Sequence, residues 1–219
     1  MSGPFTRVGT MSQPSPTPSV AAAVFGERLP LAEAYHHSLA TVAAERGFIG
    51  PKEVDRLWSR HLLNCAVISE AFDEGCSVAD IGSGAGLPGI PLAIARPDLH
   101  VTLIEPLLKR STYLGEVVEE LGLDNVTVVR GRAEEQGRAL FDAVTSRAVA
   151  PLGKLASWSL PLVKVGGAMI AMKGESVGEE LERDARDIKR AKGGEAEIFT
   201  VGGTVLEQPT TLIRIRRTH

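Results

Sequence analysis

The apolar positions between residues 20 and 72 recur every three to four residues, which is the spacing of an amphipathic helix. One group runs from Leu29 to Val42 and a second runs from Val54 to Ile68, and the segment Gly47–Pro51 separates them. Glycine and proline interrupt helices, so a break is expected there. The pattern predicts a helical N-terminal extension over residues 21–74 that packs on the domain following it.

After Cys76 the pattern changes to short apolar runs that alternate with helical segments, which is typical of strand-helix units around a parallel sheet. The first five predicted strands cover residues 77–81, 100–104, 126–130, 141–145 and 167–172. The predicted helices cover residues 89–96, 107–121, 134–139, 152–163 and 176–192. Two final apolar runs, 196–201 and 211–216, have no helix-length insert between them, so they can pair as an antiparallel hairpin. The sequence predicts an α/β domain over residues 75–219 with a seven-stranded sheet.

Residues 1–20 differ from the rest in composition. They are rich in proline and serine, as in the segment Pro14-Ser15-Pro16-Thr17-Pro18, and poor in large apolar side chains. Such a segment buries too little surface to offset the entropy lost on ordering. We therefore expect a disordered tail over residues 1–20.

Composition and charge narrow the function class only slightly. A chain of 219 residues with 43% hydrophobic content can bury the core of one domain. It has no apolar run long enough for a membrane span and no secretory signal, so we expect a cytoplasmic protein with no membrane partner. We also expect a monomer. Cys65 and Cys76 lack metal-type or redox-type spacing, which favours buried thiols and no metal. The formal net charge of -3 gives no overall attraction to nucleic acid, although basic residues cluster locally at 109–110, 130–132, 183–192 and 214–217.

The segment Val78–Gly89 contains the first chemical signal, a strand that runs into a glycine turn followed by a helix. Such a turn, here with Gly82 and Gly84, brings bare backbone and a helix N-terminus against a ligand. The subset Gly84–Gly89 also matches the dinucleotide fingerprint, which alone is weak evidence.

Two acids at successive strand ends favour one cofactor class. Asp80 can meet the ammonium of a ligand, whereas it would repel a pyrophosphate. Glu105 ends the next strand and can accept both ribose hydroxyls of an adenosine. Together with the antiparallel hairpin, these residues favour an S-adenosylmethionine-dependent methyltransferase over a nicotinamide enzyme. Each acid can alternatively be a helix cap.

The stretch Asp80–Leu92, with its sequence DIGSGAGLPGIPL, resembles the cofactor loop of the glucose-inhibited division protein B family, the ribosomal RNA small subunit methyltransferases G. Four further segments are similar to that family: Arg60–Asn64, Gly131–Glu135, Thr145–Ala150 and Ala171–Gly174. Many members carry Asp where this chain has Asn64, so the resemblance is incomplete in that motif.

The resemblance implies a class I methyltransferase fold with a Rossmann-like sheet, and transfer of a methyl group to N7 of one guanine in 16S ribosomal RNA of the small subunit. Loss of such enzymes is associated with low-level streptomycin resistance. Carried over by motif, Gly82 and Leu87 line the methionine and adenosine side, Ala133 and Glu134 lie at the adenine, and Arg147 lies at the reaction end.

The residues after the predicted fourth strand agree with an N7 target. Methylation of an amine or hydroxyl requires a proton acceptor there, and a base carbon requires a cysteine, but this chain offers Ser146-Arg147-Ala148. Guanine N7 has a free lone pair and no hydrogen. Arg147 can donate to guanine O6 or a phosphate, or alternatively form a structural ion pair with Asp80 or Glu134.

Several further residues are candidates for RNA contacts. Lys173, Arg130 and Arg132 can meet phosphates, with solvated side chains as the equal alternative. His61 can contact RNA or be a packed, hydrogen-bonded core histidine. A small-molecule methyltransferase of the same fold and a non-catalytic RNA-binding ribosome factor remain the alternative functions.

Overall fold

One mixed sheet of seven strands organises residues 15–219, the part of the chain that the computed structural model describes. The strands are β1 (Ser77–Ile81), β2 (His100–Glu105), β3 (Val126–Arg130), β4 (Phe141–Arg147), β5 (Val163–Met172), β6 (Gly193–Val201) and β7 (Thr210–Arg217). Their order across the sheet is β3-β2-β1-β4-β5-β7-β6. The first five are parallel, whereas β7 runs antiparallel to both β5 and β6. The predicted sheet with its antiparallel hairpin is confirmed.

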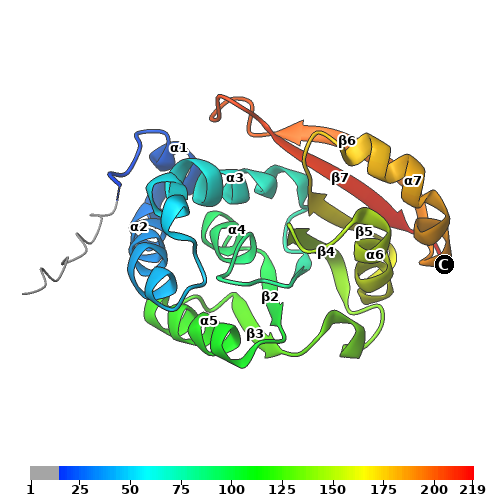
Figure 1. Ribbon diagram of the computed structural model, residues 1–219, viewed down its shortest axis with the longest axis horizontal. Coiled ribbons are helices and arrows are strands. Elements are labelled where there is room, and N and C mark those ends of the chain that lie inside the picture. The colour runs from blue at the N-terminus through cyan, green and yellow to red at the C-terminus, as the bar shows by residue number, and fades with distance from the viewer. Residues whose placement is uncertain (1–14) are drawn as a thin grey trace, which may run out of the picture.

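Helices cover both faces of the sheet (Figure 1). On one face α4 (Gly89–Ala95) and α5 (Leu108–Leu121) share a hydrophobic core with the N-terminal extension. On the other face α6 (Leu152–Ser159) and α7 (Val177–Arg190) enclose a second core. The strand order reverses between β1 and β4, and the carboxyl ends of strands at such a point form the usual ligand crevice of open α/β sheets.

The predicted helix over residues 134–139 is wrong except for a 3₁₀ turn at Ala133–Glu135. The backbone N–H groups of Ala139 and Leu140 donate to the carbonyls of Pro161 and Leu162, so they are not available for helical bonds. The predicted helix over 152–163 also ends early. It becomes a 3₁₀ turn at Leu160–Leu162, and β5 begins at Val163 instead of residue 167.

The N-terminal extension consists of short helical pieces. They are α1 (Ala21–Phe25), a 3₁₀ turn at Gly26–Arg28, α2 (Leu29–Ser38), a π turn at Leu39–Ala43, a 3₁₀ segment at Pro51–Arg56, a π turn at Leu57–Leu62, α3 (Leu63–Ala66) and a 3₁₀ turn at Val67–Ala71. The break expected near residue 50 is present as a turn over residues 46–49.

Buried hydrogen bonds tie the extension to the sheet domain. The Tyr35 hydroxyl, on a fully buried side chain, donates to the Ala85 carbonyl in the glycine turn at 2.7 Å. Ser38 Oγ and the Tyr113 hydroxyl of α5 lie 3.0 Å apart. A buried hydroxyl that finds a partner fixes orientation as well as contributing apolar burial. The extension therefore positions the glycine turn directly.

The predicted tail divides into two parts. Residues 1–14 lie outside the described residues, but residues 15–20 make contacts that the sequence analysis did not predict. Thr17 Oγ1 donates to Glu33 Oε1 at 2.7 Å, and the Pro18 carbonyl accepts from Ala21 N at 3.0 Å. The boundary predicted at residue 20 is too late, because side chains of α2 supply partners that composition does not reveal.

A chain that begins at Ala21 should melt at a lower temperature than one that begins at Ser15. The shorter chain loses the Thr17–Glu33 hydrogen bond and the Pro18 carbonyl at the start of α1, together worth about 1–2 kcal/mol. Thermal denaturation of the two chains measures the difference, and Thr17→Val in the longer chain isolates the side-chain bond. Equal melting temperatures would show that residues 15–20 contribute nothing.

Candidate functional site

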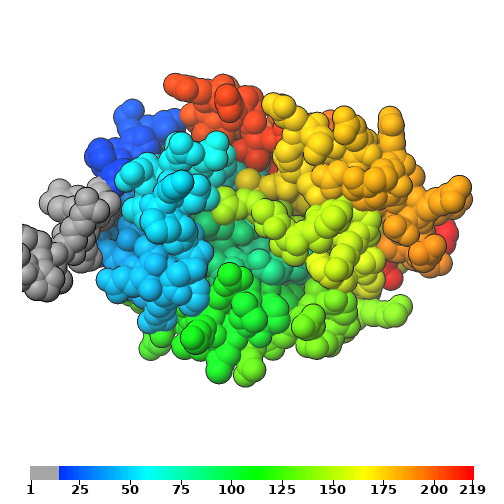
Figure 2. All heavy atoms as spheres, viewed as in Figure 1, coloured from blue at the N-terminus to red at the C-terminus, as the bar shows by residue number. Residues whose placement is uncertain are grey.

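The glycine turn between β1 and α4 leaves space for a ligand at Gly84. Its φ of +59° lies in the left-handed region, which residues with a side chain rarely adopt. A Cβ placed there would have only the Gly82 carbonyl oxygen near it, at 3.9 Å. The turn thus presents bare backbone to open space rather than to protein. In Figure 2 the surface is recessed between the N-terminal extension (cyan), α5 (green) and the yellow-green segments near α6.

Asp80 is fully buried next to this turn, in register with Leu103 of β2 and Thr145 of β4. Its Oδ2 accepts a 3.0 Å hydrogen bond from Gly89 N at the start of α4. The approach is close because Gly89 has no side chain: a Cβ there would collide with Leu103 and lie 2.8 Å from Asp80 Oδ2. Oδ2 therefore caps the N-terminus of α4, which is the alternative role that the sequence allowed for Asp80.

The other carboxylate oxygen of Asp80 is buried and has no partner among the described residues. Burial raises the pKa of Asp80 to about 7, against the hydrogen bond from Gly89, which lowers it. A buried acid with one unsatisfied oxygen is costly unless a cation or donor meets it. An ammonium group, such as that of a bound amino acid, fits this oxygen.

Glu105 lies at the end of the neighbouring strand and is 2% exposed. Its Oε2 accepts from Gly84 N at 2.9 Å and its Oε1 accepts from Leu107 N at 3.0 Å. The carboxylate therefore links the glycine turn to the segment entering α5. Each carboxylate oxygen can accept a second hydrogen bond, so the residue also fits a ribose diol.

The remaining candidates for cofactor contacts are distributed around the same strand ends. Ala133 is buried and Glu134 exposed on the 3₁₀ turn after β3, and Gly131 N bonds to the Glu105 carbonyl just before them. Leu87 is buried in the core below the turn. Gly82 N donates to the Ile104 carbonyl at 2.8 Å, which joins the start of the turn to β2. The fold thus places Asp80, Glu105 and Ala133 at three adjacent strand ends.

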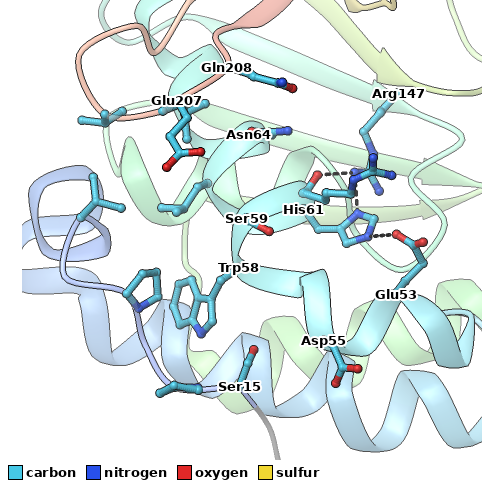
Figure 3. A pocket seen from close by; sticks show the side chains of 17 residues that line it. Ser15, Glu53, Asp55, Trp58, Ser59, His61, Asn64, Arg147, Glu207 and Gln208 are labelled. Atoms are coloured by element: carbon cyan, nitrogen blue, oxygen red, sulfur yellow. Dashed lines mark hydrogen bonds and ion pairs between the residues drawn. The ribbon is translucent and has the colours of Figure 1, made fainter.

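Arg147 ends β4, and its guanidinium turns toward the N-terminal extension (Figure 3). Its Nη1 lies 2.7 Å from His61 Nδ1 and donates more weakly to the Arg60 carbonyl at 3.4 Å. His61 Nε2 lies 2.8 Å from Glu53 Oε2. The ion pair of Arg147 with Asp80 or Glu134 that the sequence left open does not occur, because the side chain meets His61 instead.

Arg147 also stands between two cavities. One has a volume of about 910 Å³ and lies between the extension and the β6–β7 loop, with Trp58, Ser59 and Glu207 in its wall (Figure 3). The other, of about 690 Å³, lies over the ends of β4 and β5. Both are lined by Arg60, Asn64, Arg147, Glu207 and Gln208.

Val149 stands between the second cavity and the glycine turn. This side chain lines the cavity, and its Cγ2 lies 3.1 Å from the position that a Cβ on Gly82 would take. The two cavities together form one groove past Arg147, and Val149 separates its smaller part from the turn.

The four candidates for RNA contacts have different surroundings, and Arg130 is exposed at the end of β3. Lys173 is 11% exposed, and its Nζ donates to Glu180 Oε2 at 2.8 Å and to the Ala150 carbonyl at 3.0 Å. Arg132 is exposed beyond β3, an edge strand that three other strands separate from β5. His61 is 12% exposed, and both of its ring nitrogens have partners. This matches the packed, hydrogen-bonded histidine that the sequence offered as the alternative to an RNA contact.

Glu53 and Tyr35 belong to the site region, although the sequence did not point to them. Neither lies in a recognisable motif, and their partners His61 and Ala85 become neighbours only through packing. Within residues 15–219, no group of three or more His, Cys, Asp or Glu side chains is placed to hold a metal ion. That same part of the chain contains no helix long and apolar enough to span a bilayer.

Comparison with known sequences gives one consistent result. A family model described as GidB, rRNA small subunit methyltransferase G, matches residues 28–206. The chain is similar to the ribosomal RNA small subunit methyltransferase G of Corynebacterium efficiens, with 69% identity over 208 residues, covering 93% of this chain and 90% of the relative. The protein of the same name from Pseudarthrobacter chlorophenolicus is 56% identical over 193 residues, covering 88% and 89%.

Solved structures share the fold at low sequence identity. M. jannaschii TYW2, solved in complex with AdoMet, has a TM-score of 0.57 at 19% identity and covers 74% of this chain and 78% of its own. A putative S-adenosyl-L-methionine-dependent methyltransferase of Methanococcus maripaludis has a TM-score of 0.57 at 16% identity, with coverage of 86% and 92%. These likenesses confirm the predicted methyltransferase fold.

Asp80→Asn should stabilise the protein without ligand at about pH 8 and weaken binding of S-adenosylhomocysteine about tenfold or more. Because the pKa of about 7 in the folded state exceeds the ordinary value of 3.8, ionised Asp80 costs stability as pH rises from 3.8 through 7. Asn removes that cost but also removes the charge that meets an ammonium group. Thermal melts and calorimetric titrations at acidic and alkaline pH measure both effects.

Methylthioadenosine is the matched control ligand, because it keeps the adenosine but lacks the amino acid. Its affinity should be the same for the wild type and Asp80→Asn. If Asp80→Asn weakened both ligands equally, Asp80 would act only by holding the turn.

Proposed function

This chain belongs to the rRNA small subunit methyltransferase G family, and on that premise we propose that it methylates N7 of a guanine in the RNA of the small ribosomal subunit. Methylation of 16S ribosomal RNA with S-adenosylmethionine follows from the family. The position of the methyl group on the base and the roles of individual residues are our proposals.

The residues at the strand ends fit S-adenosylmethionine. When bound, this cofactor supplies a methyl group activated on a sulfonium sulfur. We assign Asp80 Oδ1 to the ammonium of its methionine part, because that oxygen is buried without a partner. Glu105 and the open backbone at Gly84 suit the ribose, while Gly82 and Leu87 belong to the turn around it. Ala133 and Glu134 suit the adenine from the turn after β3.

No residue at the end of β4 itself is an obvious proton acceptor, and the neighbouring His61 is engaged at both ring nitrogens, which supports N7 as the target. Ser146 and Arg147 end this strand, and Ser146 is 1% exposed. An acceptor with a free lone pair in the base plane needs no deprotonation, so its attack requires alignment more than acid-base chemistry.

The cysteines give no support to methylation of a base carbon. Cys65 is fully buried on α3, and burial raises its pKa to about 11. Cys76 precedes β1, at the opposite end from the glycine turn, and burial raises its pKa to about 11 as well. Both thiols therefore remain protonated at neutral pH, whereas a nucleophile must be a thiolate.

The proposal about the reaction rests on Arg147, since it ends β4 and lines both cavities. Its guanidinium can donate to O6 of the guanine, which lies beside N7 on the same edge, or to a phosphate. We propose that the RNA of the small ribosomal subunit binds in the groove formed by both cavities. The reaction then takes place in the cytoplasm. Lys173 contributes to the wall of this groove, but its charge is balanced by Glu180.

Arg147→Ala should lower the rate of methyl transfer about 10²–10³-fold, because a donor aimed at the reacting group is worth about 2.7–4 kcal/mol. Affinity for S-adenosylhomocysteine should change much less. The assay uses labelled cofactor and unmodified small subunits, followed by digestion and identification of the labelled nucleoside. The expected product is N7-methylguanosine.

Arg147→Lys provides the matched control, since it keeps the charge but not the planar set of donors. Label on an exocyclic amine, a ribose or a pyrimidine carbon would contradict the N7 assignment. Label found on a free metabolite but never on RNA would support a small-molecule methyltransferase instead.

A further inference from the structure

We propose that Glu53 and His61 are positioning residues that hold Arg147 in the orientation needed for methyl transfer, so that the N-terminal extension takes part in the reaction. This proposal rests on the role assigned to Arg147 above. Glu53 belongs to no segment of the family resemblance.

The three side chains form a continuous hydrogen-bonded chain, which Figure 3 shows along one wall of the larger cavity. Arg147 Nη1 lies 2.7 Å from His61 Nδ1, and His61 Nε2 lies 2.8 Å from Glu53 Oε2. A guanidinium can only donate, so His61 Nδ1 accepts and carries no proton. Nε2 must then carry the proton and donate to the carboxylate of Glu53. Glu53 therefore selects the tautomer of His61 that can accept from Arg147.

The surroundings of His61 favour the neutral form of its ring. Burial and the nearby Arg147 lower the pKa of His61, and Arg60 acts in the same direction. The hydrogen bond to Glu53 opposes them. A protonated ring would present an N–H to Arg147 and break the contact, so the arrangement requires the neutral form.

A neutral acceptor suits a substrate-binding arginine better than an acid does. Within residues 15–219 no carboxylate pairs with Arg147, although acids line the same groove. A carboxylate partner would fix the guanidinium but also neutralise the charge that a guanine oxygen or a phosphate is to meet. The imidazole fixes one N–H and leaves the positive charge and the other donors available.

The placement of the three residues explains why the extension is needed. Arg147 ends a central strand, whereas Glu53 lies in the 3₁₀ segment Pro51–Arg56 and His61 in the π turn Leu57–Leu62. The contact between His61 and Arg147 joins positions 86 residues apart. A long side chain at a strand end has many rotamers, and holding it in place before substrate arrives lowers the entropy lost on binding.

Paired variants test whether hydrogen-bond chemistry or mere packing matters. His61→Asn keeps an acceptor near the position of Nδ1, whereas His61→Leu keeps bulk without one. His61→Leu and Glu53→Ala should lower kcat about tenfold or more, the loss expected for a hydrogen bond to a charged group. His61→Asn should retain most of kcat. Affinity for S-adenosylhomocysteine and KM for small subunits should change less than kcat in all three.

A pH profile at saturating cofactor gives a second readout that does not depend on His61→Leu folding. Wild-type kcat should fall as pH decreases through the pKa of His61, because protonation breaks the contact with Arg147. The Glu53 contact raises the pKa of His61, so Glu53→Gln should move this acidic limb to lower pH. An unchanged limb in Glu53→Gln would overturn the proposal.

Three further results would overturn the proposal, and they distinguish its failure from failure of the proposed function. Equal losses of kcat in His61→Asn and His61→Leu, in step with lowered melting temperatures, would show that His61 only packs. Normal kcat in both Glu53→Ala and His61→Leu, together with an inactive Arg147→Ala, would support the role of Arg147. It would reject the positioning role of Glu53 and His61. Normal kcat in Arg147→Ala would reject both.

Discussion

The site depends on burial of the Asp80 carboxylate at the start of α4. Asp80 lies in the centre of the sheet, and its Oδ2 reaches Gly89 N only because no side chain stands between them. This bond fixes where α4 begins and therefore the shape of the glycine turn. It also leaves the second oxygen buried without a partner among the described residues. Burial destabilises the ionised form of this carboxylate in the protein without ligand. A bound cation offsets that free-energy cost.

The N-terminal extension is a structural part of the site and not an appendage. It supports the glycine turn through Tyr35, packs on α5 through Ser38 and reaches the end of β4 through His61. Its apolar side chains belong to the same core as α4 and α5. Because one core contains both, loosening the extension disturbs the turn and the end of β4 together. A Rossmann-like sheet alone would provide the strand ends but not these supports.

Charge around the groove is more balanced than in a typical nucleic-acid site. Glu53, Asp55 and Glu207 line the larger cavity along with Arg60 and Arg147, and Lys173 in the smaller one is paired with Glu180. A surface of this kind attracts phosphates weakly, so recognition has to rely on shape and on contacts with base edges. In the role proposed for it, Arg147 would then have a larger share in RNA recognition than a single arginine in a strongly basic groove.

The sequence alone determined the elements and the chemistry that depends on neighbours along the chain. Apolar periodicity located all seven strands, and the spacing of Asp80, the glycines and Glu105 located the turn at the strand ends. These features follow from local backbone preferences and from the rule that parallel strands end at one edge of a sheet. The family resemblance then added the class of substrate and placed Arg147 in the site.

The tertiary structure decided which side chains meet, because such contacts join distant positions that no periodicity records. Residues 136–139 are irregular and not helical, because the backbone N–H groups of Ala139 and Leu140 bond to the segment after α6, despite a helical pattern. Lys173 is paired with Glu180 rather than free, and Thr17 is bound to Glu33 within a segment whose composition suggested disorder. Arg147 meets His61 and, through it, Glu53, where the sequence offered Asp80 or Glu134. Each partner was chosen by packing of the extension against the sheet, which depends on the whole core and not on local sequence.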